Sequence, residues 1–452
     1  MDNNFNNQYT QNNMNNGYGY RQPFNNTIYN SQPYTNPTYN QGYANYGYNP
    51  NPYYNPNAGG YSYYQNLYNM FGGYNPIVDK DFSTIGKLGL VAGGSLLAVF
   101  VMQIVVSTVI GVLLQVFGVN TDDTTLLLVV NSIGQAFYML LPFAIIGLLN
   151  KPERKGLVSV FGAPKSGMLC IIGVFAGLMV TQLGNFATSY FSVVLEMAGV
   201  SFGSGTEDIV FQTDFISTLI SILTTAAMPA LFEEFAFRGV LMQPLRKYGD
   251  WFAIIMSSFC FAVVHGNMVQ IPFAFIAGIS MGYFCIKTKS IWTSVAIHFL
   301  NNLLSVLFTV YYTVYPDASM LLYYVVEGAL LIIGTVAFIV FKKNCSIKLK
   351  KDATSMSKHK GLKSAAFIAT PPMTIAIAFA LLSSITFTEL TPGGWFIIIG
   401  GLFFVGFYFV RAFLRIKKEK RVKFKGMYTA SMIIALFSCA FLAIAALLSV
   451  AV

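Results

Sequence analysis

Charged residues are scarce in this chain: they make up 10% of its 452 residues, whereas 55% of the residues are hydrophobic. A soluble domain carries about a quarter charged residues. The scarcity therefore excludes an ordinary water-soluble enzyme. Apolar runs of about twenty residues recur along the chain, and runs of this length are typical of helices that cross a membrane. We predict an all-α polytopic membrane protein.

Cysteine and histidine are also rare, with five and three residues respectively. Four of the cysteines fall in apolar segments and the fifth falls in a basic loop. No disulfide framework is therefore indicated. The cysteines are Cys170, Cys260, Cys285, Cys439 and, in the loop, Cys345.

Residues 1–78 differ from the rest of the chain because they are rich in Asn, Tyr, Gln, Gly and Pro and poor in aliphatic residues. We predict a disordered cytosolic tail whose aromatic residues favour weak self-association; a solvated leader without such a role is the alternative. Because this polar stretch precedes the first apolar run, we expect no cleavable signal peptide and a retained first anchor.

We predict about eleven transmembrane helices after the tail, each long enough, or nearly so, to cross about 30 Å of hydrocarbon at 1.5 Å per residue. The apolar segments lie at 88–117, 125–149, 167–199, 215–242, 251–270, 271–286, 291–314, 319–341, 371–390, 394–410 and 427–452. We divide them into a catalytic core at 79–345, a basic cytosolic loop at 346–370 and additional membrane helices at 371–452.

Basic and acidic loops alternate along the chain. The chain has eight Lys and Arg residues from Lys342 through Lys363, and eight more from Arg411 through Lys425. With the N-terminus in the cytosol, eleven crossings place every basic loop inside, as the positive-inside rule requires, and the C-terminus outside. We therefore attribute the net charge of +10 to topology rather than to nucleic-acid binding, and expect a bacterial plasma-membrane protein.

The fourth apolar segment contains three charged residues, although a charge at the centre of a spanning helix costs about 2.5–3.5 kcal/mol on insertion scales. Glu234 and Arg238 are four residues apart, which predicts an ion pair on one helix face. Glu233 points about 100° away and has no partner on its own helix. A lone carboxylate in low dielectric is suited to act as a general base. Alternatively, all three residues serve only to hold helices together.

Two of the three histidines, His265 and His298, lie in apolar segments. Asn302 follows His298 by one helical turn and shares its face. The helical rise places Glu233, His265, His298 and Asn302 about 12–21 Å from the nearest cytosolic loops, so they can meet in one layer. A carboxylate, two imidazoles and an amide form a polar site that can activate water and stabilise an oxyanion.

Three motifs follow one another along these segments: EEFAFR at 233–238, FAVVH at 261–265 and HFLNN at 298–302. In this order they resemble the signature of the CPBP family of intramembrane proteases, also called the Abi or CAAX-protease family. The resemblance covers about 215–310. It implies a glutamate-dependent intramembrane endopeptidase with a CPBP-like core of membrane helices.

The resemblance also implies a role for each motif residue. Glu233, helped by His265, would activate water, and His298 and Asn302 would stabilise the oxyanion. The family is often described as metalloproteases, but this chain has no HExxH motif. Glu233, His265 and His298 either bind zinc or hydrogen-bond a water molecule. The residues expected to structure the site are Glu234, Arg238 and Phe261.

We expect the partners to be membrane lipid and a membrane-associated protein or peptide, cleaved near the cytosolic half of the bilayer. One alternative is a proton- or ion-coupled transporter that uses the same Glu, His and Arg residues as a relay. Another is a catalytically silent membrane scaffold that recruits partners through the N-terminal tail.

Overall fold

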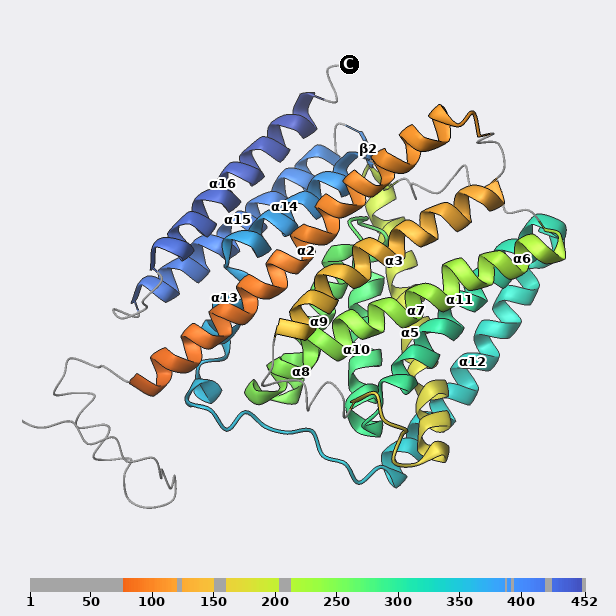
Figure 1. The fold of residues 1–452 in the computed structure, drawn as a ribbon, viewed down its shortest axis with the longest axis horizontal. Helices are drawn as coiled ribbons and strands as arrows, with labels where there is room; N and C mark the ends of the chain where they lie inside the picture. The colour runs from red at the N-terminus through yellow and green to blue at the C-terminus, as the bar shows by residue number, and fades with distance from the viewer. Residues whose placement is uncertain are drawn as a thin grey trace, which may run out of the picture. The chain divides into compact units, whose positions relative to one another are not determined.

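The structure is a computed structural model that describes residues 76–119, 124–149, 160–202, 213–386, 388–391, 394–418 and 425–448. The predicted disordered tail falls almost entirely outside these residues. Ser62–Val452 form one compact unit, in which long helices predominate (Figure 1). The prediction of an all-α polytopic membrane protein is confirmed.

The helices and strands follow one another with few irregular connections. They are α2 (Pro76–Val116), α3 (Thr124–Leu149), α5 (Gly167–Met197), β1 (Val200–Phe202), α6 (Phe215–Ser221), η2 (Ile222–Ala227), α7 (Met228–Glu234), η3 (Phe235–Leu241), α8 (Met242–Leu245), η4 (Arg246–Tyr248), α9 (Asp250–Val264), α10 (Gln270–Thr288), α11 (Ile291–Val314), α12 (Pro316–Asn344), η5 (Ser355–Lys358), α13 (Lys360–Ile368), α14 (Pro371–Thr386), β2 (Thr388–Leu390), α15 (Gly394–Lys418) and α16 (Lys425–Leu448). The two strands pair antiparallel, with Ser201 opposite Glu389.

The number of membrane spans differs from the predicted eleven. Within the described ranges, nine helices are long and apolar enough to cross a membrane, or ten if the bent pair α13–α14 forms one span. The remaining difference, between ten and eleven, lies in α9, whose 15 residues extend about 22 Å. The predicted segment for this helix, 251–270, extends too far, because Gly266 adopts a φ of +58° and turns the chain.

A bend of 75° separates α13 from α14. Pro371 and Pro372 follow the bend. Because proline has no backbone N–H and disfavours helical geometry in the residue before it, α13 cannot continue and ends at Ile368. The segment 346–370, predicted as a basic loop, therefore contains the helix α13.

One end of the bundle gathers basic residues, and we call it the basic end. The Arg246 guanidinium pairs with Asp250 at 2.8 Å, and the Lys247 ammonium lies 3.6 Å from the Asp81 carboxylate. Lys350 N–H donates to Asp250 at 2.7 Å. These contacts bring together the start of α2, the start of α9 and the chain after α12. We call the opposite end, where α3, α6 and α12 begin, the far end.

Helix α2 lies between α3 and α14 (Figure 1). Its glycines allow the close contact with the C-terminal helices: a Cβ atom on Gly89 would collide with the backbone of Phe367, and one on Gly93 with the backbone of Met373. Small residues four apart permit this kind of backbone approach between membrane helices. The C-terminal helices are thus packed directly against the core.

Candidate active site

The fourth predicted segment is an interrupted helix, in which the π-helices η2 and η3 flank α7. Pro229 near the start of α7 has no N–H, so the carbonyl of Thr225, four residues earlier, receives no helical hydrogen bond from it. The Asn302 amide of α11 donates to this carbonyl at 3.2 Å. The proline thus frees a backbone acceptor that positions a predicted site residue.

Glu234 and Arg238 form the ion pair that their spacing predicts, with 2.6 Å between Oε1 and Nη1 and both side chains fully buried. Arg238 Nη2 also donates to the carbonyl of Gly278 in α10 at 3.2 Å. The guanidinium carbon lies 4.4 Å from the centre of the Phe261 ring. These contacts compensate the buried charges and tie three helices together.

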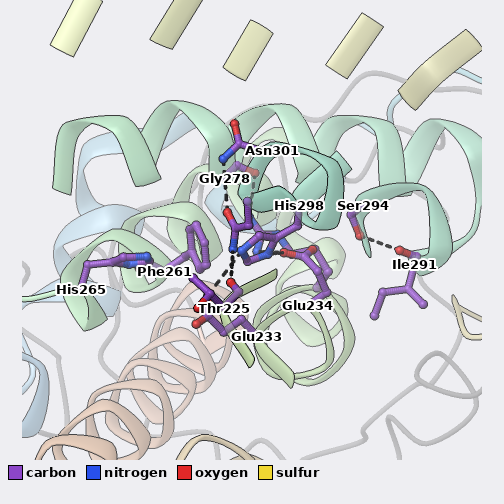
Figure 2. A network of polar contacts seen from close by, with 12 residues as sticks. Thr225, Glu233, Glu234, Phe261, His265, Gly278, Ile291, Ser294, His298 and Asn301 are labelled. Carbon is purple, nitrogen blue, oxygen red and sulfur yellow. Dashed lines mark hydrogen bonds and ion pairs between the residues drawn. The ribbon is translucent and has the colours of Figure 1, made fainter. Parts of the chain in front are cut away.

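His298 contacts both glutamates (Figure 2). Its Nδ1 lies 3.1 Å from Glu234 Oε1, and its Nε2 lies 3.9 Å from Glu233 Oε2. The ring is therefore held on one side by the Glu234–Arg238 pair and presents its other nitrogen to Glu233.

Glu233 has a further partner that the motifs do not include. The Gln135 side chain of α3 donates to Glu233 Oε1 at 3.4 Å, and Glu233 is only 7% exposed. Asn131 lies one turn before Gln135 in a mainly apolar helix. Two amides at this spacing in a membrane helix are the sequence signal that indicates the contribution of α3.

A second group of amides surrounds Asn302. Asn301 Nδ2 donates to Asn302 Oδ1 at 3.3 Å, and Gln182 Nε2 of α5 donates to Asn301 Oδ1 at 3.5 Å. Asn185 Nδ2 in turn donates to Gln182 Oε1 at 2.6 Å. None of these three amide residues, Asn301, Gln182 and Asn185, was predicted as a site residue. They extend the polar network from α11 to α5.

His265 lies apart from the other site residues. It caps α9, and its Nδ1 lies 2.7 Å from the backbone oxygen of Phe261, its own helical neighbour. The Phe261 ring lies between His265 and His298 (Figure 2). Its centre is 4.9 Å from the centre of the His265 ring and 5.8 Å from the centre of the His298 ring. His265 makes no ion pair with Glu233 among the described residues.

The candidate zinc ligands do not form a ligand set in this arrangement. Zinc requires donor atoms about 2.0–2.2 Å from one common point. Glu233 and His298 approach one another, but the Phe261 ring lies between His265 and His298, and the backbone contact occupies His265 Nδ1. In the described part of the chain, no three His, Cys, Asp or Glu side chains are placed to hold a metal ion. The residues therefore do not fit this metal.

All four predicted catalytic residues nevertheless line one cavity of about 560 Å³. The cavity is bounded by α3, α5, η2, α7, α9, α10 and α11. Glu233, His298 and Phe261 are its most buried ionisable or aromatic residues. A carboxylate and an imidazole 3.9 Å apart, next to amide donors, can activate a water molecule and bind an oxyanion.

Residues 215–304 match the family model described as type II CAAX prenyl endopeptidase Rce1-like. This range contains all three motifs, and the resemblance predicted from them is confirmed for this segment. No curated protein and no solved structure matches the chain.

Proposed function

Because residues 215–304 match the Rce1-like family of type II CAAX prenyl endopeptidases, we propose that this integral membrane protein is an intramembrane endopeptidase with Glu233 as its general base. The observation that carries the proposal is the approach of Glu233 and His298 at the buried end of a cavity large enough for a peptide segment. Its substrate is a membrane-associated protein or peptide.

In the proposed reaction, the Glu233 carboxylate accepts a proton from a water molecule while the water oxygen attacks the carbonyl carbon of the scissile peptide bond. The carbonyl oxygen becomes the oxyanion of a tetrahedral intermediate. The C–N bond then breaks, and the leaving nitrogen takes up the proton that Glu233 received. One carboxylate thus serves first as base and then, when protonated, as acid.

His298 and Asn302 are the proposed oxyanion donors. In the doubly protonated form of the His298 ring, Nδ1–H donates to Glu234 and orients the ring, and Nε2–H points into the cavity. Asn302 uses one amide hydrogen for the Thr225 carbonyl and retains a second for the oxyanion. His265 lies beyond Phe261, so its proposed help to Glu233 passes through a bridging water molecule.

The test is peptide cleavage by the purified full-length protein in detergent, with a peptide library as substrate. Replacing Glu233 with Gln removes the base while keeping the size of the side chain, and we expect kcat to fall by about 10²–10⁴-fold. Glu327→Gln is the matched control, because Glu327 is a buried carboxylate of α12 that does not line the cavity. It should cleave like the parent protein.

His298→Ala should lower activity more than His265→Ala, because only His298 approaches Glu233. We also expect cleavage to survive a chelator, since the candidate zinc ligands do not converge. Parental activity of the Glu233→Gln variant would refute the proposal, whatever the effect of the chelator.

A further inference from the structure

The cavity has a buried floor and an exposed mouth. Glu233 and His298 form the floor and are 7% and 6% exposed. Asn131, Gln270 and Ser305 also line the cavity, but their side chains are exposed, so they mark the mouth. The three mouth residues are polar and uncharged.

The mouth lies toward the far end of the bundle. On α11, which begins at the basic end, Ser305 lies about 10 Å beyond His298 at the helical rise. On α3, which begins at the far end, the lining residues run from Leu128 to Tyr138, in the first part of the helix. On the interrupted helix, the lining residues run from Thr224 to Glu233, and Glu233 is the one nearest the basic end.

Packed side chains fill the space behind the floor, toward the basic end. The Glu234–Arg238 pair is fully buried there. The rings of Phe143 and Phe237 lie 5.4 Å apart, and those of Phe237 and Phe261 lie 5.2 Å apart. A substrate therefore cannot reach Glu233 from the basic end without displacing this packing, whereas the mouth leads to it directly.

The two walls of the cavity differ in chemistry. One part of the lining, from α3, η2 and α11, presents mainly amides and hydroxyls, whereas the part from α10 is mainly apolar after Gln270. The amide and aliphatic hydroxyl side chains of the polar wall belong to Asn131, Ser132, Gln135, Thr224, Thr225, Asn301, Asn302 and Ser305, and Leu128, Tyr138 and His298 lie among them. The apolar wall consists of Phe273, Ala274, Ala277 and Met281.

Binding a free C-terminal carboxylate would call for a Lys or Arg side chain, because the histidine on the floor, His298, is the proposed oxyanion donor. None of the cavity's lining residues is Lys or Arg, and the one acidic residue, Glu233, would repel a carboxylate. An isoprenoid chain entering through the mouth would strip water from Asn131, Gln270 and Ser305 without offering them hydrogen bonds. A peptide backbone supplies such bonds.

We infer that the substrate is an internal segment of an unprenylated, amphipathic peptide that enters from the far end. The inference rests on the proposed function and names its substrate class. If the basic end faces the cytosol, as the positive-inside rule requires, the peptide reaches the site from the extracytoplasmic side. This replaces the expectation of cleavage near the cytosolic half of the bilayer.

The first test uses the full chain in sealed proteoliposomes and a fluorogenic amphipathic peptide, amidated at its C-terminus and added outside. Ser346 is exposed at the basic end, whereas the native Cys345 beside it is buried. In a Ser346→Cys variant, reaction with an impermeant thiol reagent therefore measures the fraction of molecules that have the basic end outside. Cleavage should rise in proportion to molecules with the far end outside. Proportionality to the opposite fraction would overturn the inference. Absence of Glu233-dependent cleavage from either side would instead refute the proposed function.

The second test narrows the mouth. We expect Asn131→Trp and Ser305→Trp to lower kcat/KM by about tenfold or more. Ile133→Trp and Leu307→Trp are the matched controls, because these residues are exposed apolar positions on the same two helices outside the cavity. Equal effects of all four variants would overturn the inference. So would a preference of about tenfold or more for a farnesylated peptide with a free carboxylate over the amidated peptide.

Discussion

Residues 215–304 and the helices α13–α16 belong to the same compact unit but are held by different interactions. In the first region, an ion pair and a histidine are buried within membrane helices around Glu234. In the second, the glycines of α2 allow direct backbone contact, and Thr374 and Ser431 share a hydroxyl hydrogen bond. The buried cation of the second region, Lys363, lies at the basic end, where its ammonium donates to the Tyr248 carbonyl.

The difference shows where this protein tolerates charge in its membrane interior. Buried charges are costly in hydrocarbon, and the first region keeps its Glu234–Arg238 pair beside the proposed site. None of the described residues of α13–α16 lines the cavity, and these helices associate through small residues and hydroxyls instead. The C-terminal helices therefore support the core without contributing to the proposed chemistry.

The largest expected effect comes from breaking the charge compensation of the first region. Arg238→Leu leaves the fully buried Glu234 carboxylate without its cation. We expect a loss of about 3–5 kcal/mol in the free energy of unfolding, because an uncompensated buried charge remains. Denaturant unfolding in detergent micelles measures this change.

The double variant Glu234→Gln/Arg238→Leu is the control for this interpretation. It removes both charges, so part of the lost stability should return even though two side chains have changed. A double variant no more stable than Arg238→Leu would show that packing of the arginine, rather than its charge, dominates.

The second region should instead be sensitive to side-chain volume. Gly93→Ala places a methyl group against the backbone of Met373, which cannot move without shifting α14. We expect a loss near the upper part of the range of about 1–3 kcal/mol for overpacking. Gly94→Ala is the matched control, because a Cβ atom there meets no other atom within 4 Å. Equal losses in the two variants would contradict direct backbone contact as the basis of this packing.

Helical periodicity and membrane energetics predicted much of this molecule from the sequence. Apolar length located the helices, and the four-residue spacing of Glu234 and Arg238 predicted a pair that the structure contains. Both inferences are local, since they depend on residues within one helix. The roles assigned to Glu233, His265, His298 and Asn302 stay predictions.

The remaining features depend on contacts between helices or on backbone irregularities. Gln135 reaches Glu233 across 98 positions of sequence, and no local pattern specifies that partner. The π-helices around α7 and the turn at Gly266 alter helix length and register. The placement of Phe261 between His265 and His298 follows from how α9 packs beside α11, which spacing within each motif does not determine.

The smallest expected effect concerns the buried cation of the second region. Lys363 donates to Asp352 at 2.7 Å and to the Tyr248 carbonyl at 2.8 Å, and its ammonium lies 4.6 Å from the centre of the Phe252 ring. Lys363→Met removes these contacts, but the Asp352 side chain is 10% exposed and lies where water can replace the lost donor. We therefore expect a loss of only about 1 kcal/mol, the low end for an unpaired polar group.

Lys360→Met, at an exposed position of the same helix, is the control and should leave the free energy of unfolding unchanged. Both variants are measured by the denaturant unfolding used for Arg238→Leu. A loss for Lys363→Met as large as that for Arg238→Leu would mean that depth in the membrane does not set the cost of an unpaired partner. The contrast between the two regions would then rest on packing alone.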